Sequence, residues 1–418
     1  MRTVSSGSRT EKLNQDIFHR YDIRGVYGVD FDDQFARELA NKIVTHFGPT
    51  KVLVARDGRA SSEGLERLVL TGITQAGSDA ISIGLSTTPL FYWSVLAAQA
   101  DLGIMITASH NPGRYNGFKV LRGDGTLVGG DPLRKLFAEE YVVTNGGGNL
   151  LTMETRAQYL EQVIVAAGPE PLHMAISVNA PPLLEPHMGV LAQQYGLTFQ
   201  RDASLHVHTD PDADRISFYE GGEKIPAETI CALLADQLGA QKVVHDLRFS
   251  RSILEYWKQK SIQATASRIG RLDMARNMRE QDAQVGGEIS GHFYFKQFHY
   301  LEAPELVLLL VLRAMQKAGT TLVELTKPYR KYAKSEEITV PNGDRWVRLR
   351  QRILETYHDG TISERDGVTV EYTDADNMLL WWCNLRPSNT EPVMRLIVEA
   401  KTKDLLDEKV SELMYLLQ

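Results

Sequence analysis

Short apolar runs alternate with amphipathic stretches along the chain from residue 51. The runs 51–55 (KVLVA), 81–85 (ISIGL) and 102–107 (LGIMIT) have the length and composition of buried strands, while 61–75 and 88–100 have the pattern of helices. Strands that alternate with helices predict βαβ units on a mixed or parallel sheet.

The same alternation returns in two further stretches. Glycines at 146–148 mark a loop, after which a helix is expected at 151–167. The elements expected next are strand 174–179, helix 185–195, strand 205–209, strand 242–247, helix 252–260 and strand 262–267. Three weakly similar α/β units therefore follow one another, with a first boundary near residue 150.

The last part of the chain has a different pattern. An apolar helix is expected at 304–318, and the elements predicted after it are strand 338–340, helix 346–357, strands 368–372, 378–385 and 393–400, and a closing helix. Consecutive strands of this kind predict a separate α+β unit with an antiparallel sheet.

Composition narrows the class of protein. The chain has 418 residues, 43% of them hydrophobic and 24% charged, which is typical of a soluble globular enzyme with several domains. A formal net charge of -7 argues against a general nucleic-acid binder.

Residues 1–16 lack an apolar signal core, and the longest apolar run, 306–312, is too short to span a bilayer. The two cysteines, Cys231 and Cys383, lie in apolar runs and fit a reducing compartment, so a cytoplasmic protein without a membrane partner is predicted.

The string TASHNPGRYNGFK follows the strand at 102–107. Open α/β sheets bind ligands at the carboxyl ends of their strands, so this string is well placed for chemistry. Ser109 can serve as a nucleophile or phosphoryl carrier, His110 can orient it, and Lys119 can supply a cation or take part in proton transfer. The alternative is an Asn-Pro turn rich in small polar residues.

A second string, TDPDADRISF, places Asp210, Asp212 and Asp214 at every second position after the strand at 205–209. Three carboxylates at this spacing can converge on one hard cation such as Mg²⁺, whose charge offsets their mutual repulsion. A calcium loop of the EF-hand type is excluded because Arg215 stands where its turn needs glycine. A solvated acidic turn is the remaining alternative.

Two further strings have the composition of binding loops. In GGEISGH, an extended backbone would place Glu288, Ser290 and His292 on one face, where they could accept and donate to sugar hydroxyls; a glycine-bounded strand end is the alternative. In RPSNTEP, Arg386 and short donors gather around a tight loop, which suits a phosphate, although an ordinary turn has the same composition. The short donors are Ser388, Asn389 and Thr390.

Near the N-terminus, FHRYDIRG places Arg20 and Arg24 before a glycine turn. Arg24 could neutralise a phosphate, while a solvated arginine pair is the commoner meaning.

Taken in this order, the five strings resemble the α-D-phosphohexomutase superfamily, and most closely its phosphomannomutase/phosphoglucomutase branch. The resemblance extends from Phe18 to Ala400. It implies three related α/β domains with mixed sheets and a C-terminal α+β domain around a central cleft. The implied domains are 1–150 (phosphoserine loop), 151–221 (shortened, metal-binding), 222–332 (sugar recognition) and 333–418 (phosphate binding).

The resemblance also implies a role for each matching residue. Ser109 would be the phosphoserine, and Asp210, Asp212 and Asp214 would hold the Mg²⁺ that also contacts it. Arg24, His110 and Lys119 would assist phosphoryl and proton transfer. The implied substrate-binding residues are Arg215, Arg251, Glu288, Ser290, His292, Arg386, Ser388, Asn389 and Thr390. Hexose 1-phosphate and hexose 6-phosphate would interconvert through hexose 1,6-bisphosphate, which also acts as activator.

The chain departs from the family pattern in three places. The segment between 174–179 and 205–209 is short for a full second domain, so its sheet is expected to lack a strand or helix. Arg271 follows Gly270 where the family has histidine, and 301–305 reads LEAPE where an acidic Asp-Asp-Gly motif is usual. A catalytically weak sugar-phosphate binding or regulatory protein would explain these departures and stays open. A phosphatase would need a water-positioning base near Ser109, and the sequence identifies none. The sequence does not decide between mannose and glucose, and it does not give the oligomeric state.

Overall fold

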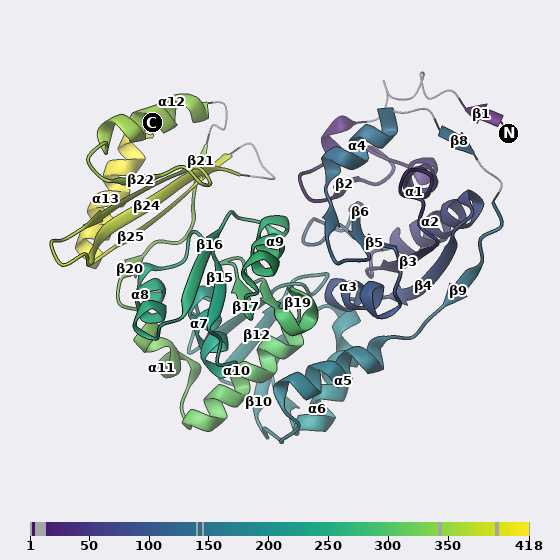
Figure 1. Cartoon of the computed structure of the whole chain (residues 1–418). Helices are drawn as coiled ribbons and strands as arrows, with labels where there is room; N and C mark the ends of the chain where they lie inside the picture. Colours follow the sequence, from purple (N-terminus) through teal and green to yellow (C-terminus); the bar gives the residue numbers. More distant parts are fainter. Residues whose placement is uncertain are drawn as a thin grey trace. The chain divides into compact units, whose positions relative to one another are not determined.

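The computed structural model describes residues 2–4, 14–138, 141–143, 146–341, 345–388 and 393–417 (Figure 1). The chain divides into two compact units. Unit 1 comprises 1–224 and 292–316, and unit 2 comprises 225–291 and 317–418. The four domains expected from the sequence remain a prediction, because these units group the chain differently.

The first α/β repeat lies in unit 1. Its elements are β2 (Ile23–Val26), α1 (Asp33–Phe47), β3 (Lys51–Arg56), α2 (Ser62–Ala76), β4 (Asp79–Leu85), α3 (Thr88–Ala97), β5 (Leu102–Ile106), β6 (Tyr115–Arg122), β7 (Leu127–Val128), α4 (Gly130–Ala138) and β9 (Leu150–Thr152). The strand order is β2-β6-β5-β3-β4-β9, with β7 beside β6. Strands β3, β4, β5 and β9 are parallel, and β6 runs antiparallel to β5. A short antiparallel pair, β1 (Arg2–Val4) and β8 (Tyr141–Val143), completes the described elements of this region.

Both faces of this first sheet are covered. Val54 and Ile104 pack in one core with residues of α1 and α2, and Met105 packs in a second core with Phe91 and Val95 of α3. Every residue of β5 is buried, which explains its unbroken apolar sequence LGIMI.

The second repeat also lies in unit 1. Its elements are α5 (Arg156–Ala167), β10 (Ala175–Asn179), α6 (Glu185–Tyr195), β11 (Thr198–Phe199), β12 (Leu205–Thr209), β13 (Ile216–Glu220) and β14 (Glu223–Lys224). The same unit contains the hairpin β18 (Phe293–Phe295) and β19 (Leu301–Glu302) and most of α10 (Pro304–Ala318). The strand order is β11-β10-β12-β13-β14.

The second sheet has one open face because a helix is missing. Residues 200–204, all described, join β11 to β12 without a helix, whereas α3 joins β4 to β5 in the first repeat. The residues on the open face are polar and partly exposed, namely Ser177, His206, His208, Ser217 and Tyr219. Those on the opposite face are buried and mostly apolar, among them Ile176, Leu205, Val207 and Phe218. The sequence LHVHT of β12 alternates in the same way, with Leu205 and Val207 on the buried face and His206 and His208 on the open face.

The third repeat lies in unit 2. Its elements are α7 (Ala227–Gln237), β15 (Lys242–Asp246), α8 (Arg251–Gln259), β16 (Gln263–Ser267), α9 (Arg271–Gln281) and β17 (Val285–Gly287). Strand β15 is central and parallel to both β16 and β17. In each of the three repeats, the first parallel strand therefore lies between the second and the third, as β3, β10 and β15 show.

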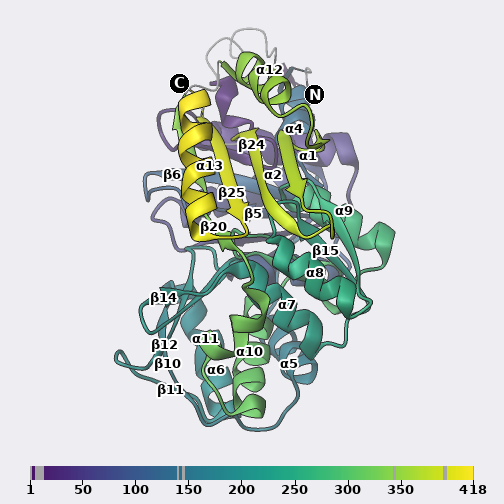
Figure 2. The ribbon, with the colours of Figure 1, turned by 90° about the vertical axis from the view of Figure 1, so that its left-hand side faces the viewer.

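The C-terminal part of unit 2 is an antiparallel sheet covered by helices (Figure 2). Its elements are α11 (Leu322–Thr326), β20 (Ala333–Lys334), β21 (Ile338–Pro341), α12 (Trp346–Thr356), β22 (Thr361–Ser363), β23 (Val368–Thr373), β24 (Leu379–Pro387), β25 (Val393–Ala400) and α13 (Lys403–Leu416). Both α12 and α13 contribute to one apolar core with β23, β24 and β25. The α+β unit predicted from the sequence is confirmed.

The sequence placed one helix too early. A helix was expected at 151–167, but 150–152 forms strand β9 beside β4, and helix α5 begins at Arg156. The apolar pair Leu150 and Leu151 adds an edge to the first sheet, a pairing across many residues that local periodicity does not reveal.

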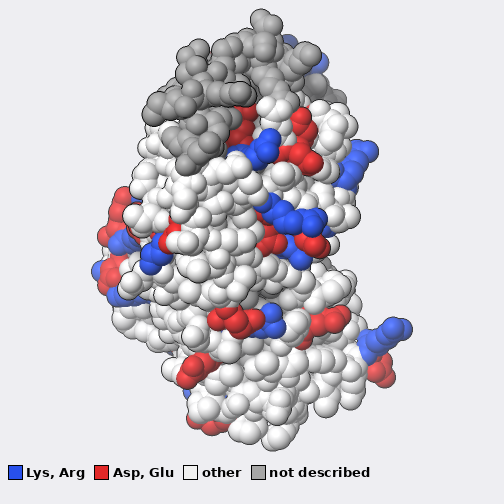
Figure 3. Space-filling view, turned by 90° about the vertical axis from the view of Figure 1, so that its right-hand side faces the viewer, with Lys and Arg blue, Asp and Glu red and all other residues white. Residues whose placement is uncertain are grey.

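The molecular surface carries charges of both signs. On the face shown in Figure 3, acidic and basic side chains of the described residues are interspersed.

Among the described helices, no single helix is long and apolar enough to cross a membrane, while the bent pair Pro304–Ala318 and Leu322–Tyr329 passes that test by length and composition only.

Candidate active site

Equivalent loops of the three repeats carry most of the expected site residues. Each loop follows the third parallel strand of its repeat: residues 107–114 follow β5, 210–215 follow β12 and 288–292 follow β17. The carboxyl end of a strand is where α/β sheets place their ligand sites. The shared strand order therefore puts chemically different strings at the same place in each of the three repeats.

Ser109 is buried in an uncommon backbone conformation. Its φ angle is 50°, in the left-handed region that few residues other than glycine adopt. Its N–H donates to Thr107 Oγ1 over 2.9 Å, and its Oγ lies 3.5 Å from His110 Nδ1. The loop therefore holds the serine backbone in one conformation.

Asp210, Asp212 and Asp214 converge as the sequence predicted. One ligand oxygen from each lies within 4.8 Å of those of the other two. Each carboxylate also has one oxygen held by the protein. Asp210 Oδ1 accepts from two backbone N–H groups over 3.1 Å, and Asp212 Oδ2 accepts from Thr88 Oγ1 over 2.9 Å.

Lys119 joins this acidic loop to the first sheet. Its ammonium donates to Asp212 Oδ2 over 2.7 Å and to Asp214 Oδ2 over 3.0 Å. Burial alone would lower the pKa of Lys119, but the charges of these two carboxylates raise it well above its usual value. Lys119 is therefore a cation at neutral pH.

The remaining oxygens suit a divalent cation. Asp210 Oδ2, Asp212 Oδ1 and Asp214 Oδ1 are buried and make no hydrogen bond. Burial, then the charges of Asp214 and Asp212, raise the pKa of Asp210 well above its usual range. Lys119 and Arg215, whose Nε lies 3.6 Å from Asp210 Oδ2, bring two positive charges to three carboxylates. Oxygen donors of this kind are those that Mg²⁺ prefers. The residues present therefore fit a Mg²⁺ ion.

Lys119 and His292 set the charge of the other two aspartates. Burial and Asp214 oppose ionisation of Asp212, yet Lys119 lowers its pKa. Burial likewise opposes ionisation of Asp214, but Lys119 and then His292 bring its pKa well below the usual range. Both side chains are carboxylates at neutral pH, as metal ligands must be.

Arginines surround the loop that contains Ser109. Arg24 donates twice to Asp22 Oδ2, over 2.9 and 2.7 Å, and its Nη1 donates to Asn111 Oδ1 over 3.0 Å. Arg215 Nη2 lies 3.4 Å from His110 Nδ1. Burial, then the charges of Arg215 and Arg24, lower the pKa of His110 to about 4. His110 is therefore neutral at pH 7.

Strand β17 ends at Gly287, and residues 288–292 of the segment GGEISGH are not extended, which corrects the interpretation of one strand face and agrees with the alternative of a glycine-bounded strand end. Residues 289–290 form a turn in which Gly291 N–H donates to Glu288 O over 3.1 Å, and Gly291 has a φ angle of 90° that favours glycine. The three side chains therefore do not share one strand face. His292 belongs to unit 1, where its Nε2 lies 3.4 Å from Asp214 Oδ1.

Glu288 and Ser290 lie in unit 2. Glu288 is buried, and its Oε1 accepts from the N–H of Gly270 over 2.7 Å, directly before Arg271 opens helix α9. Ser290 is exposed.

Arg386 belongs to an arginine cluster in unit 2. Glu337 Oε1 lies 3.5 Å from Arg386 Nη2 and 2.5 Å from Arg248 Nη1, and Glu337 Oε2 lies 4.0 Å from Arg395 Nε. Burial, followed by the charge of Arg248, lowers the pKa of Arg386. Ser388 N–H donates to Val393 O over 2.8 Å at the end of the β24–β25 hairpin. Asn389 and Thr390 lie outside the described residues.

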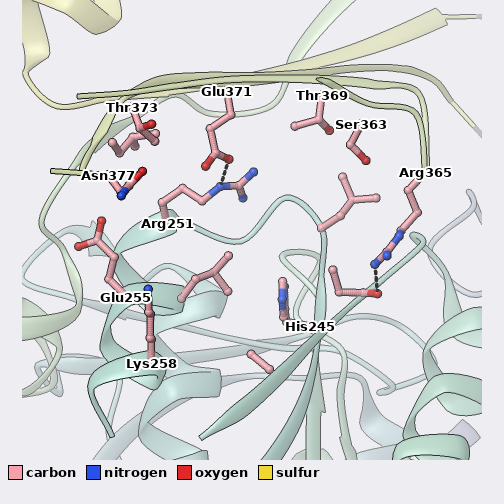
Figure 4. Close-up of a pocket in the computed structure, with 15 residues that line it drawn as sticks. His245, Arg251, Glu255, Lys258, Ser363, Arg365, Thr369, Glu371, Thr373 and Asn377 are labelled. Carbon is pink, nitrogen blue, oxygen red and sulfur yellow. Dashed lines mark hydrogen bonds and ion pairs between the residues drawn. The ribbon is translucent and has the colours of Figure 1, made fainter. Parts of the chain in front are cut away.

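Arg251 lines a pocket of about 420 Å³ in unit 2 (Figure 4). Its Nε donates to Glu371 Oε2 over 2.6 Å, and its guanidinium lies 4.2 Å from the centre of the Trp382 ring. The other expected substrate residues do not line this pocket, and His245 is visible at its inner end.

Sequence reasoning missed four residues that organise these loops. Thr88 donates to Asp212, and Asp22 pairs with Arg24. Arg248 pairs with both Asp246 and Glu337. Arg59, discussed below, contacts the loop that contains Ser109. The string RDGR (56–59), directly after the expected strand 51–55, was a usable signal, because it stands at a carboxyl strand end like the strings that were identified.

Comparisons with known proteins place this chain in a family. Models of three phosphoglucomutase/phosphomannomutase domains match the chain, namely alpha/beta/alpha domain I at 15–139, alpha/beta/alpha domain III at 226–332 and the C-terminal domain at 321–414. Together they cover about three quarters of the residues. The chain belongs to the α-D-phosphohexomutase superfamily. Membership assigns it to the phosphohexomutases, which are intramolecular phosphotransferases.

Individual members of the superfamily align over nearly the whole chain. A phosphomannomutase of Methanocaldococcus jannaschii is 29% identical, with 95% of this chain and 96% of the relative covered. A probable phosphoglucosamine mutase of Thermococcus gammatolerans is 26% identical, with 94% and 95% covered.

Two solved structures share the fold. A phosphoglucomutase/phosphomannomutase family protein of Burkholderia thailandensis has a TM-score of 0.84 at 23% identity, over 97% of both chains. An N-acetylphosphoglucosamine mutase of Aspergillus fumigatus, in complex with GlcNAc-6P and magnesium, has a TM-score of 0.55 at 14% identity, over 79% of this chain and 92% of that one.

Proposed function

We propose that this protein interconverts hexose 1-phosphate and hexose 6-phosphate, with mannose or glucose as the sugar, through a phosphoserine at Ser109. The observation that supports this most directly is the meeting of two loops of unit 1. Arg215 of the acidic loop lies 3.4 Å from His110 beside Ser109, and Lys119 bridges Asp212 and Asp214. A serine loop that meets a loop of carboxylates paired with a buried cation combines a phosphoryl carrier with charge neutralisation.

In the proposed reaction, Ser109 Oγ gives its phosphoryl group to the free hydroxyl of the sugar phosphate, which produces hexose 1,6-bisphosphate. Ser109 Oγ then takes the other phosphoryl group back. Mg²⁺ bound by Asp210, Asp212 and Asp214 would neutralise negative charge on the transferring group. The ammonium of Lys119 and the guanidinium of Arg24 would also neutralise negative charge on the transferring group.

The sugar phosphate must be held in two orientations, one for each half-reaction. The arginine cluster of unit 2 has the composition of a phosphate site, since its three arginines, Arg248, Arg386 and Arg395, outnumber its two carboxylates, Asp246 and Glu337. We assign the phosphate clamp to Arg386 and Ser388, together with Asn389 and Thr390, which follow them in the sequence. The proposed contacts to sugar hydroxyls are Glu288, Ser290 and His292, with Arg215 and Arg251 as further substrate contacts.

We also propose the cytoplasm as the location, because both cysteines are free and buried. Hexose 1,6-bisphosphate is the proposed activator, since it phosphorylates Ser109 when the enzyme has lost its phosphoryl group.

The test is a coupled assay on mannose 1-phosphate, glucose 1-phosphate and glucosamine 1-phosphate, combined with intact mass spectrometry. We expect turnover of at least one of the first two, dependence on Mg²⁺, priming by hexose 1,6-bisphosphate, and a phosphate adduct that Ser109→Ala loses. Turnover of glucosamine 1-phosphate alone would transfer the assignment to the amino-sugar mutases. Equal turnover by Ser109→Ala would refute the phosphoserine, and binding without turnover would favour a regulatory sugar-phosphate binder.

A further inference from the structure

Arg59 uses both terminal nitrogens of its guanidinium group on the loop that contains Ser109 and on Tyr115, the residue that follows this loop. Its Nη1 donates to Pro112 O over 2.9 Å and to Tyr115 O over 3.1 Å, and its Nη2 donates to Ser109 O and, over 2.8 Å, to Asn111 O. The fifth donor, Nε, is 2.8 Å from Asp57 Oδ2. A guanidinium has five N–H donors, so none is left for solvent or ligand.

Arg59 is itself firmly held. Asp57 accepts both from its Nε and, over 3.0 Å, from its backbone N–H, and Ser62 Oγ donates to the same carboxylate over 2.6 Å. The side chains of Arg59 and Asp57 are only 8% and 3% exposed. Asp57 N–H in turn donates to Ile106 O over 3.0 Å, at the end of the strand that precedes the loop. The first sheet therefore supports Arg59, and Arg59 supports the loop.

The loop needs this support because its backbone is strained at Ser109. A left-handed conformation at a serine persists only where surrounding contacts determine it. Thr107 Oγ1 accepts from the N–H of Ser109, and Arg59 donates to the carbonyl of the same residue. These two contacts hold the backbone on both sides of the Ser109 side chain.

We propose that Arg59 is a positioning residue for phosphoryl transfer, which fixes Ser109 in its left-handed conformation through three backbone carbonyls of the loop and the carbonyl of Tyr115 at its end. It acts without touching substrate, because all of its donors are already used. Lysine cannot replace it, since an ammonium has three donors and no planar fork. This inference rests on the proposed function, in which Ser109 carries the phosphoryl group.

The test compares Arg59→Lys with Arg56→Lys. Arg56 is a matched control, because it lies three residues away and donates to Glu66 over 2.9 Å without contacting the loop carbonyls. We expect Arg59→Lys to lower kcat about 100-fold with little change in KM, as a displacement of the reacting atom does. Hydrogen exchange at residues 108–115 should be faster than in the wild type, and Arg56→Lys should match the wild type in both measurements.

A purely structural role predicts a different result. It would lower the melting temperature and the folded fraction of Arg59→Lys, but leave kcat per folded molecule within about threefold of the wild type, and that outcome would overturn the inference. If Arg59→Lys does not fold, Arg59→Ala is measured with added guanidinium, which should restore kcat if the lost contacts to the carbonyls are responsible. Rescue that fails in folded Arg59→Ala also overturns it.

The two proposals fail separately. Absence of a phosphate adduct and of turnover in both the wild type and Arg56→Lys would contradict the proposed function. Normal turnover in those two proteins together with normal kcat in folded Arg59→Lys would contradict only the role of Arg59. Exchange at 108–115 reports on the loop in either case.

Discussion

The first and second repeats share a strand order but differ in how their sheets are covered. Strand β5 is buried on both faces, between α1 and α2 on one side and α3 on the other. Strand β12 occupies the equivalent place, yet one of its faces is open, because residues 200–204 replace the second helix.

The second residue of each strand shows how the sequence reflects the covered and the open face. Gly103 is the second residue of β5, and a Cβ atom there would lie 2.3 Å from Val95 Cγ2 and 2.8 Å from Phe91 Cζ of helix α3. His206, the second residue of β12, carries a large side chain on the open face. The loop after each strand nevertheless keeps its place at the strand end. Covering the sheet and positioning the site are therefore separate requirements of the fold.

The largest expected effect comes from Lys119, which connects the two regions. Lys119→Met removes the cation from two buried carboxylates, Asp212 and Asp214, and breaking a buried ion pair in this way costs about 3–5 kcal/mol of unfolding free energy. We expect the loss to be full in EDTA and partly reversed by Mg²⁺, measured by urea denaturation in both conditions.

Lys42→Met is the matched control for this measurement. Lys42 is also buried, but its ammonium donates to Leu136 O over 2.8 Å and lies 3.9 Å from Glu38 Oε1, away from the three aspartates of the candidate site. Stabilisation by Mg²⁺ that is equal in the two variants would argue against a metal site at the aspartates.

A smaller effect is expected at Gly103. Gly103→Ala forces α3 away from the sheet, and overpacking of this kind costs about 1–3 kcal/mol. Its counterpart on the open face, His206→Ala, should change the unfolding free energy by less than about 0.5 kcal/mol. Urea denaturation of both variants checks the comparison, and an equal cost at the two positions would mean that the second sheet is covered as the first one is.

A further buried contact, comparable in expected cost to Gly103→Ala, lies on the covered side of the second repeat. Glu305 of α10 accepts from Tyr159 Oη of α5 over 2.7 Å and lies 2.6 Å from His187 Nδ1 of α6. Burial opposes ionisation of Glu305, but His187, then Tyr159, bring the net pKa below its usual value. A carboxyl whose pKa falls on folding stabilises the protein at pH values above its unfolded pKa, and this contribution is lost as the pH falls through the folded value.

We therefore expect Glu305→Gln to cost about 1–3 kcal/mol at pH 7, since it disturbs a buried hydrogen-bond network. The cost should shrink as the pH falls below about 4.3, the ordinary pKa of a glutamate. Chemical denaturation across this pH range provides the measurement, and a cost that does not depend on pH would contradict the ionised state of Glu305.

Much of the fold could be predicted from local sequence pattern. Helix 185–195 and strands 205–209 and 393–400 have the expected bounds, because each presents its periodicity without interruption. Strand β9 was missed because its pairing partner is distant in the sequence. The extended interpretation of 288–292 was wrong, while its alternative, a glycine-bounded strand end, is confirmed, because β17 ends at Gly287 and a turn follows.

The candidate site could be predicted as residue types but not as contacts. Three aspartates at alternate positions indicated a shared cation, and the structure brings them together. Arg59 and Thr88 carry no unusual spacing, and their importance comes from carbonyls and carboxylates far along the chain. His292 was grouped with Glu288 by sequence, whereas the fold puts it beside Asp214.

The central claim is that one serine carries the phosphoryl group between two positions of a sugar, and a single-turnover experiment tests it most directly. Protein labelled with ³²P at Ser109 is mixed with excess glucose 1-phosphate or mannose 1-phosphate and Mg²⁺, and the label is followed over time. The account predicts that the label moves from the protein into hexose 1,6-bisphosphate and then hexose 6-phosphate. Label that appears as inorganic phosphate, or that stays on the protein, would contradict it.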